Sequence, residues 1–256
     1  MRVVSICPSN TEVLGYLGKT DLLVGVDNYS DWPLSVKDLP RVGPDLSIDM
    51  DKVADLNPDL VIASLSVPGM EKNIEALKER NLPYIVLNPN SLEEIADDIQ
   101  IVGEAIGFRE LGQIKSDEFR SKVKNYRQQS QGINNKPTLY WEWWPKPIFT
   151  PGGLNWLTEI SELAGGENIF ASEEVASFRT DWEDVKTRNP DHICMVWVGV
   201  KEEKMNPELV IKRPGWKENM KAIQEGNIHV LEESLFCRPS PRLLEGLEKL
   251  AAVLNK

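Results

Sequence analysis

Apolar and polar residues follow two different periods along the chain, and the change of period marks the expected elements. Short, nearly continuous apolar runs are typical of buried strands, and apolar positions three and four residues apart are typical of helices. Strands are expected at Arg2–Cys7, Leu22–Val26, Asp59–Ser64, Tyr84–Leu87, Thr138–Trp144, Asp191–Val198 and Ile228–Leu231. Because strands and helices alternate, we expect an α/β fold built from βαβ units with mainly parallel sheets.

Helical spacing and helix-start signals indicate the segments between these strands. A capping box at Ser9–Glu12 predicts a helix that runs to about Leu17. Further helices are expected at Asp49–Leu56, Gly69–Arg80, Leu154–Leu163, Asp181–Arg188, Pro214–Gln224 and Pro241–Leu254. The proline- and glycine-rich or polar segments left over, including Pro145–Gly153, Ala176–Thr180 and Leu235–Pro239, are expected to be loops.

The stretch Ser91–Gln131 has the pattern of two consecutive helices. Ser91 and Glu94 form a second capping box, and the apolar spacing continues to a break near Gly107. Beyond it the apolar positions thin to Leu111, Ile114, Phe119, Val123 and Tyr126, without a proline. This pattern predicts a long, solvent-exposed helix of about 35 Å, at about 1.5 Å per residue. We expect it to join two lobes, which gives residues 1–107, the connecting helix 108–134 and residues 135–256 as the parts of the chain.

A weak internal repeat supports two similar lobes. Asp49–Ile62 (DMDKVADLNPDLVI) and Asp181–Cys194 (DWEDVKTRNPDHIC) share Asp, Val, Asn, Pro and Asp at equivalent positions. Each copy reads as a short acidic helix, an Asn-Pro-Asp stop and a buried strand. Coincidence is the alternative, since Asn-Pro-Asp is a common connector between a helix and a strand.

Two α/β lobes joined in this way are expected to leave a ligand cleft at the carboxyl ends of their strands. The loops expected there carry many large aromatic residues: Tyr29, Trp32, Trp143, Trp144, Phe149, Phe178 and Phe236. A flat or macrocyclic apolar ligand needs such faces, and each stacking contact adds about 0.5–1.5 kcal/mol beyond the area it buries. The alternative is that Trp141 and Trp143 only alternate along a strand, one inside the core and one outside.

Composition narrows the classes of partner. The formal net charge of −11 argues against nucleic acid or an anionic membrane, which need basic patches. No apolar run has the length of a membrane span, and a strand begins almost at Met1, with no signal segment before it. We therefore expect a cytoplasmic monomer, or an extracytoplasmic protein if a leader has been removed. The three cysteines are expected to be buried thiols, and two isolated histidines make a metal site improbable.

Signals for catalysis are poor. The chain has no GxSxG, P-loop, HExxH or strand-linked GxGxxG motif. Ser5, Ser9 and Asp27 are available, but neither histidine is placed to activate a serine. A carboxylate pair by chance is expected among so many acids. The residues therefore favour a binding protein without a catalytic cofactor.

Several motifs, in their order along the chain, resemble a known family. They are RVVSICPSNTEVLGYLG, GVDNYSDWP, NPDLVIAS, LNPNSLEEIADDI, AGGENIF and RPSPRLLEGLEKLAAVL. With these motifs the chain resembles class III solute-binding proteins of ABC importers, and most closely the cobalamin-binding receptors. The resemblance covers nearly the whole chain, and it implies two Rossmann-like lobes, a connecting helix and a ligand cleft between the lobes.

The resemblance also implies roles for individual residues. Tyr29, Phe149 and, with a shift of about one residue, Phe178 correspond to aromatic ligand contacts of the cobalamin receptors. A further ligand tryptophan of the family corresponds to Asp45, so Trp32, Trp143 or Trp144 would have to compensate. Asp51 and Glu183 correspond to acidic residues that dock onto arginines of a membrane permease; their alternative is an ordinary solvated helix face.

Three functions follow as expectations. The first is a non-enzymatic receptor for cobalamin or a related corrinoid. The second is a receptor for a ferric siderophore or haem, whose anionic ligand would call for cations such as Arg179, Lys201, Arg238 or Arg242. The third is a cytoplasmic enzyme or accessory acting on a tetrapyrrole or corrinoid. Phe236 and Arg238, from one loop, are included among the expected ligand contacts.

Overall fold

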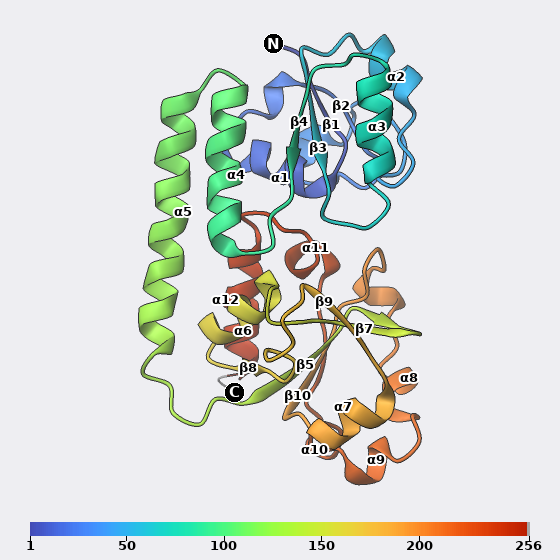
Figure 1. Cartoon of the computed structure of the whole chain (residues 1–256). Coiled ribbons are helices and arrows are strands. Elements are labelled where there is room, and N and C mark those ends of the chain that lie inside the picture. Colours follow the sequence, from blue (N-terminus) through green and yellow to red (C-terminus); the bar gives the residue numbers. More distant parts are fainter. Residues whose placement is uncertain (255–256) are drawn as a thin grey trace. The chain divides into compact units, whose positions relative to one another are not determined.

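The computed structural model describes residues 1–254, which form two compact units. Unit 1 contains Met1–Ser121 and the short segment Pro239–Pro241, and unit 2 contains Lys122–Arg238 and the residues from Arg242 onward. Figure 1 traces the elements of each unit along the chain. Of the helices in the described part, none combines the length and the apolarity that a bilayer crossing needs.

Unit 1 is built on a parallel sheet with the strand order β2-β1-β3-β4. The strands are β1 (Val3–Ser5), β2 (Leu23–Val26), β3 (Leu60–Ser64) and β4 (Tyr84–Leu87). Every residue of β1 and β3 is buried, as expected for central strands that helices cover on both faces. The helices are α1 (Pro8–Tyr16), α2 (Met50–Asp55), α3 (Glu71–Glu79) and α4 (Leu92–Ala105).

The start of α1 differs from the sequence prediction. Helix α1 begins at Pro8, and the N-cap residue is Cys7, which makes no side-chain capping bond. The expected capping box at Ser9–Glu12 is therefore wrong. Proline is favoured at the first helical position, and Pro8 starts the helix closer to the N-terminus than the capping box predicts. The second capping box is confirmed, since the Ser91 hydroxyl accepts a hydrogen bond from the Glu94 amide at 3.1 Å.

Helices α4 and α5 (Arg109–Ser130) lie side by side in Figure 1, and the turn at Gly107 separates them as predicted. Gly107 has a φ of +82°, which suits glycine at a helix C-terminus. A Cβ built on Gly103 would lie 2.5 Å from Cα of Gly112, so only small residues permit this approach. The buried stripe of α5 therefore uses Gly112 and Ser116 as well as Phe119 and Val123, whereas Ile114, expected in the stripe, is 49% exposed.

Unit 2 contains a second parallel sheet, with the order β11-β10-β5-β8. Its strands are β5 (Thr138–Glu142), β8 (Glu167–Asn168), β10 (His192–Met195) and β11 (Ile228–Val230). The helices of the unit are α6 (Trp156–Leu163), α7 (Trp182–Arg188), α8 (Glu208–Ile211), α9 (Trp216–Asn219), α10 (Lys221–Gln224), α11 (Glu233–Phe236) and α12 (Leu243–Leu254). The helix expected at Pro214–Gln224 is divided into α9 and α10, because Met220 has extended backbone.

A small antiparallel sheet of unit 2 was not predicted. Its strands are β6 (Trp144–Pro145), β7 (Ile148–Pro151) and β9 (Ser177–Thr180), in the order β6-β7-β9. They lie in the segments Pro145–Gly153 and Ala176–Thr180, which the sequence indicated as loops. The expected loop Leu235–Pro239 also begins inside a helix, α11. Strands of two to four residues that contain proline carry too little periodicity to be recognised.

The repeat has the same local structure in both units. Asp49 and Asp181 accept hydrogen bonds from the first-turn amides of α2 and α7, so both are N-caps. Val53 and Val185 are both completely buried. The two helices are followed by residues in the left-handed region, Asn57 with φ 45° and Asn189 with φ 44°. Directly before the strand that follows, each copy has an aspartate that accepts a backbone N–H: Asp59 from Arg2 at 2.6 Å and Asp191 from Thr138 at 2.8 Å.

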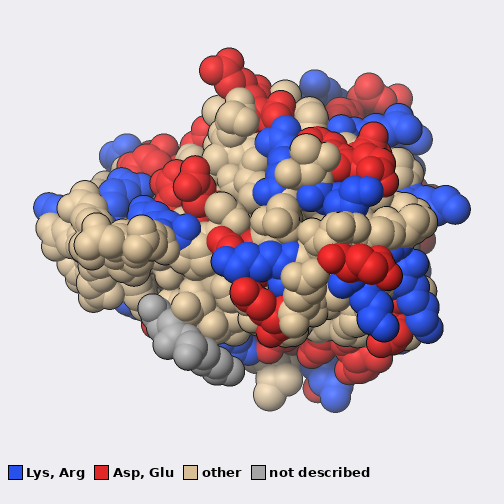
Figure 2. All heavy atoms as spheres, turned by 90° about the horizontal axis from the view of Figure 1, so that it is seen from below, with Lys and Arg blue, Asp and Glu red and all other residues tan. Residues whose placement is uncertain are grey.

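On the face of the molecule drawn in Figure 2, the acidic side chains do not form one continuous patch. Acidic and basic side chains are interspersed there, and tan surface separates them. On this face, therefore, the net charge of −11 does not take the form of a single acidic patch.

Candidate functional site

The outer face of the β6-β7-β9 sheet presents two aromatic residues and an arginine in one row. Trp144 of β6 pairs with Phe149 of β7, and Phe149 pairs with Arg179 of β9. Directly opposite residues in antiparallel strands put their side chains on the same face, with Cβ atoms about 4.5–5.5 Å apart. Trp144 is 43% exposed, Phe149 is half-buried and Arg179 is exposed. We call these three residues the aromatic row.

The opposite face of this sheet packs on the core of unit 2. Ile148 and Thr150 are buried, and Phe178 packs against Phe170 with ring centroids 5.5 Å apart. Because Phe178 and Arg179 are neighbours in one strand, they point to opposite faces. The structure thus places Phe178 with the core and Arg179 on the outer face, whereas the family resemblance implied Phe178 as one of the ligand contacts.

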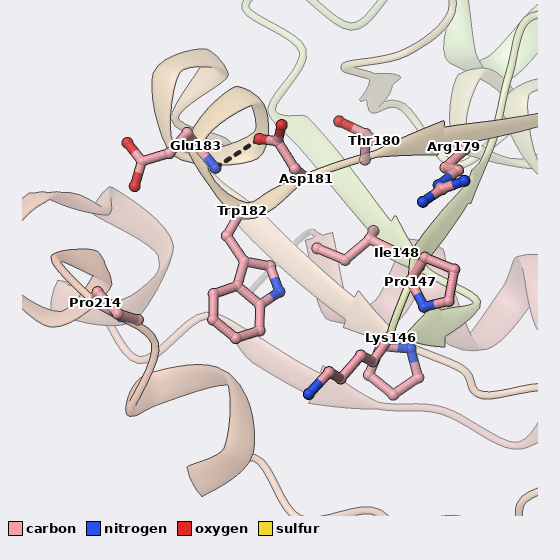
Figure 3. A pocket seen from close by; sticks show the side chains of 10 residues that line it. Lys146, Pro147, Ile148, Arg179, Thr180, Asp181, Trp182, Glu183 and Pro214 are labelled. Carbon is pink, nitrogen blue, oxygen red and sulfur yellow. Dashed lines mark hydrogen bonds between the residues drawn. The ribbon is translucent and has the colours of Figure 1, made fainter.

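An open hollow of about 400 Å³ lies where this sheet meets the start of α7. Figure 3 shows the Trp182 ring extending toward the turn at Lys146 and Pro147, while the Glu183 carboxylate points away from that ring. Trp182 is 37% exposed. The lining consists of Pro145, Lys146, Pro147, Ile148, Arg179, Thr180, Asp181, Trp182, Glu183 and Pro214.

The Trp182 ring lies next to the arginine of a buried ion pair. Arg213 lies 5.2 Å from the Trp182 ring and 4.6 Å from the Trp216 ring. Its two terminal nitrogens donate to the Glu142 carboxylate at 2.5 and 2.9 Å. Both residues of the pair are almost completely buried. The pair therefore ties the α8–α9 connection to the end of β5, directly before Trp143 and Trp144.

Two further donors complete the partners of the Glu142 carboxylate. Tyr140 donates its hydroxyl at 2.9 Å, and Trp197 donates its indole N–H at 3.1 Å. Burial, together with the adjacent carboxylate, raises the pKa of Tyr140 well above its ordinary value, so this hydroxyl stays a donor. A carboxylate with four donors is the arrangement that a buried charge requires.

In unit 1, Tyr29 is displayed on a tightly held loop. It is 52% exposed, and its amide donates to the buried Asp27 carboxylate at 2.7 Å. The Ser30 amide and hydroxyl donate to the same carboxylate. Arg41 donates to the carbonyls of Asp27 and Ser30 at 2.9 and 2.6 Å. An exposed aromatic on a loop with this many hydrogen bonds is ready to meet a ligand with little loss of conformational entropy.

The remaining aromatic and cationic candidates lie in less accessible places. Trp32 packs on α1, since a Cβ on Gly15 would lie 2.4 Å from its ring, and Trp143 is half-buried with its ring 5.7 Å from that of Trp156. Phe236 is completely buried against Trp141, at 5.5 Å between centroids. The Arg238 side chain is 10% exposed and pairs with Glu233 at 3.3 Å. Phe236 has no surface to offer a ligand in this structure.

The two acids indicated for docking occupy equivalent, exposed positions. Asp51 and Glu183 lie in the first turns of α2 and α7. Asp51 pairs with Arg80 at 2.9 Å, and Glu183 pairs with Lys186 at 2.5 Å. Exposed pairs of this kind contribute little to stability.

Cysteine and histidine chemistry gives no reactive centre. Burial raises the pKa of Cys7 to about 11, and it also raises the pKa values of Cys194 and Cys237 well above the ordinary value of a thiol. Cys237 is half-buried rather than buried as expected. The two histidines are half-buried and adjacent, with Nδ1 of His192 3.0 Å from Nε2 of His229. Within residues 1–254, no group of three or more His, Cys, Asp or Glu side chains could hold a metal ion.

Sequence reasoning missed the composition of the row and the buried pair behind Trp182. Arg179 was named only as a cation that an anionic ligand would need. The two-residue alternation of side chains along Ser177–Thr180 could have separated Arg179 from Phe178, had this segment been recognised as a strand. Glu142 and Arg213 are far apart in the sequence, and no local signal connects them.

Comparisons with known proteins agree with this architecture. Residues 3–235 match the family model described as periplasmic binding protein. A vitamin B12-binding protein of Vibrio cholerae is 30% identical over 257 residues, which cover 99% of this chain and 89% of that protein. An uncharacterized ABC transporter substrate-binding lipoprotein of Bacillus subtilis is 30% identical over 98% of this chain and 78% of its own length.

Solved structures give the same result. The crystal structure of the periplasmic vitamin B12 binding protein of Vibrio cholerae superimposes with a TM-score of 0.81 at 28% identity, covering 99% of this chain and 96% of that one. The haem complex of a Staphylococcus aureus protein has a TM-score of 0.85 at 20% identity, over 100% and 99% of the two chains, and supports the fold alone. The chain belongs to the periplasmic binding protein family, as a non-enzymatic solute-binding protein of the class III ABC-transporter type.

Proposed function

We propose that the chain binds cobalamin or a closely related corrinoid as the solute-binding component of an ABC-type uptake system. The observation that carries the proposal is the aromatic row, whose Trp144 and Phe149 side chains lie next to each other on an outer sheet face. A corrin ring is large, flat and partly apolar, and it matches two adjacent aromatic faces. The relatives named vitamin B12-binding proteins add support from sequence.

Tyr29 is the proposed ligand contact of unit 1. It combines more than half of its surface exposed with the rigid Asp27–Ser30 loop. Trp32 and Trp143 are proposed as packing residues that support their loops, because each is half-buried against a neighbour. Phe178, Phe236 and Arg238 are left out of the proposed contact set on the grounds of their packing.

The experiment is a calorimetric titration of the purified chain with cyanocobalamin, repeated for Tyr29→Ala, Trp144→Ala and Phe149→Ala. We expect each variant to lose about tenfold in affinity, because each removes one stacking face and the apolar area around it. The control is Phe108→Ala, an aromatic residue that is 39% exposed at the turn between α4 and α5 and lies outside the proposed site. Unchanged affinity in all three variants would contradict the proposed contact set.

A ferric siderophore or haem is the second candidate, and Arg179 is the observation that favours it. An exposed arginine beside aromatic residues suits the carboxylates of such ligands. Titration with haemin and with a ferric siderophore under the same conditions decides between the candidates. Tight haemin or siderophore binding without corrinoid binding would replace the first proposal by the second.

We also propose that Asp51 and Glu183 dock the chain onto arginines of a membrane permease. Both acids are exposed at equivalent places of the repeat, and an ABC importer supplies its receptor with such a partner. Asp51→Ala with Glu183→Ala should reduce uptake of labelled cyanocobalamin by cells that carry the permease and leave its binding unchanged. Asp55→Ala with Glu174→Ala, which removes two other exposed acids, is the matched control. Equal uptake by both double variants would contradict the docking role.

The place of action follows from the proposed partner. A receptor that delivers a ligand to an importer works outside the cytoplasmic membrane, whereas the sequence favoured a cytoplasmic protein. Cell fractionation of the native host with an antibody against the chain tests this directly. Recovery in the cytosol alone would contradict the uptake role and leave corrinoid binding to be explained by a cytoplasmic relative of such receptors.

A further inference from the structure

Among the arginines, Arg179 alone has no partner within the part of the chain that the structure describes. Within residues 1–254 its guanidinium makes no hydrogen bond and no ion pair. The others are all engaged: Arg188 pairs with Glu173 and Asp184, for example, and Arg120 pairs with Glu93 and Asp97. The guanidinium donates five N–H groups in a fixed fork and never loses its charge in this range of pH. Five donors are therefore available at this position.

The fold keeps Arg179 on the outer face of its sheet. On either side of it, Phe178 packs into the core and Thr180 donates its hydroxyl to Asp184 at 2.7 Å. These two contacts fix the register of β9, so Arg179 cannot rotate inward. Its cross-strand neighbour is Phe149, and Trp144 follows on the other side of Phe149. The cation thus lies at one end of the aromatic row.

The nearby acids are already occupied by other partners. The Asp181 carboxylate caps α7 by accepting the amides of Glu183 and Asp184 at 2.9 and 3.0 Å. The Glu183 carboxylate pairs with Lys186. Lys146 lines the same hollow as Arg179 and adds a second positive charge there. Within residues 1–254 Arg179 and Lys146 form no ion pair, although Asp181 and Glu183 line the same hollow, so two cations are available beside flat apolar faces.

We propose that Arg179 binds an oxyanion, a phosphodiester or a carboxylate, at the edge of the ring-shaped ligand that Trp144 and Phe149 hold. This inference deepens the proposed function and rests on it. Cyanocobalamin carries one ionised acid, the phosphodiester of its nucleotide loop, whereas dicyanocobinamide keeps the corrin ring and lacks that group. The arginine fork matches a phosphodiester through two parallel hydrogen bonds. Arg179 would then select corrinoids that have a complete nucleotide loop.

The test compares the binding of two ligands by two proteins, so that the effect of the substitution on one ligand can be set against its effect on the other. Affinities of the purified chain and of Arg179→Gln are measured by calorimetry for cyanocobalamin and for dicyanocobinamide. We expect the substitution to weaken cyanocobalamin binding about 10–100-fold, the range for a lost hydrogen bond to a charged group, and to change dicyanocobinamide binding less than about twofold. Arg179→Lys should recover part of the loss, because it keeps the charge without the fork.

The control for overall charge is Lys217→Gln, which removes an exposed cation of α9 in the same unit. It should leave both affinities unchanged. Equal losses for the two corrinoids with Arg179→Gln, or no loss for either, would overturn the role of Arg179 while leaving corrinoid binding in place. Failure of the unsubstituted chain to bind any of the ligands would instead remove the proposed function, and the Arg179 inference with it.

A second pair of ligands distinguishes a carboxylate from a phosphodiester as the oxyanion that Arg179 binds. If the chain binds haemin and no corrinoid, haemin and its dimethyl ester replace the two corrinoids in the comparison. A loss with Arg179→Gln for haemin alone would then assign Arg179 to a carboxylate rather than to a phosphodiester. A similar loss for haemin and its ester would overturn the oxyanion contact.

Discussion

The two copies of the repeated helix–stop–strand unit share a framework and differ in what they display. In both, an aspartate caps the helix, a valine fills the core and a left-handed asparagine ends the helix. The second residue differs: Met50 is 5% exposed, whereas its counterpart Trp182 is 37% exposed and lines the hollow. The common residues determine how the chain folds locally, and the variable ones give unit 2 a surface that the same motif does not form with Met50.

Disrupting the buried Arg213–Glu142 ion pair next to Trp182 is expected to give the largest difference in stability between the two units. Arg213→Met leaves the Glu142 carboxylate buried without its cation, so unfolding free energy should fall by about 3–5 kcal/mol. The loss should be confined to unit 2, as amide hydrogen exchange can show. The double variant Arg213→Met with Glu142→Gln should recover much of the loss, because it removes the uncompensated charge. A small, uniform decrease over both units would contradict this.

The two units should respond to pH in opposite directions. In unit 1, burial, with help from Asp97 and Glu94, raises the pKa of Asp98 to about 7. The folded state then holds the proton more tightly than the unfolded state, so stability falls as pH rises from about 4 to 7, by up to about 4 kcal/mol. Asp98→Asn should raise stability at pH 8 and change it little at pH 4, with Glu110→Gln as the control.

Unit 2 should lose stability toward acid instead. Burial lowers the pKa of His192, so the unfolded state binds the proton more readily and stability falls as pH falls below about 6.5. For Asp191 burial alone would raise the pKa, but the bonds from Lys221 and Thr138 outweigh it and lower the pKa. That contribution is lost as pH falls through the lowered value. Exchange rates, corrected for their intrinsic pH dependence, should show this for unit 2, and the same pH trend in both units would contradict the assignment.

The core valines of the repeat should behave alike. Val53→Ala and Val185→Ala each remove two buried carbon groups at positions with no exposed surface. We expect each to lower the unfolding free energy by about 2 kcal/mol, from about 0.8 kcal/mol per CH₂ plus a cavity contribution. Denaturant titration of the two variants measures both values. A difference larger than about 1 kcal/mol would show that the copies do not share a framework energetically.

The stop residues should show the smallest difference between the copies. Glycine relieves the left-handed strain at both positions. The Asn57 side chain donates only to the exposed carbonyl of Asp55, two residues before it, at 3.1 Å, whereas the Asn189 side chain accepts the amide of the distant Lys221 at 2.9 Å. Asn57→Gly should therefore be neutral or slightly stabilising, and Asn189→Gly should cost about 1 kcal/mol for the lost hydrogen bond. Equal changes in thermal midpoint would show that this bond contributes nothing.

The framework was predictable because local signals determine it. The parallel strands, the Gly107 turn and the repeat follow from periodicity, caps and stop residues within a few positions of each other. The buried stripe of α5 was only partly predictable, since Gly112 and Ser116 are chosen for the close approach of α4 rather than for apolarity. A count of hydrophobic residues does not detect such positions.

The aromatic residues of the candidate site could be proposed from the sequence, but the direction in which individual side chains point could not. Tyr29, Trp144 and Phe149 were identified from aromatic residues in segments that a core does not require. Which of Phe178 and Arg179 faces outward depends on the pairing of β9 with β7, a contact between distant segments. The burial of Phe236 depends in the same way on its packing against Trp141. Residue types alone could not decide either case.

The most direct test of the central claim is the titration of the purified chain with cyanocobalamin, followed by heat and by the visible spectrum of the ligand. Corrinoid binding predicts saturable association with one ligand per chain and a shift of the corrin absorption bands. Absence of both heat and spectral change at about 100 µM ligand, where even weak receptors of Kd near 1 µM would be saturated, would contradict the account.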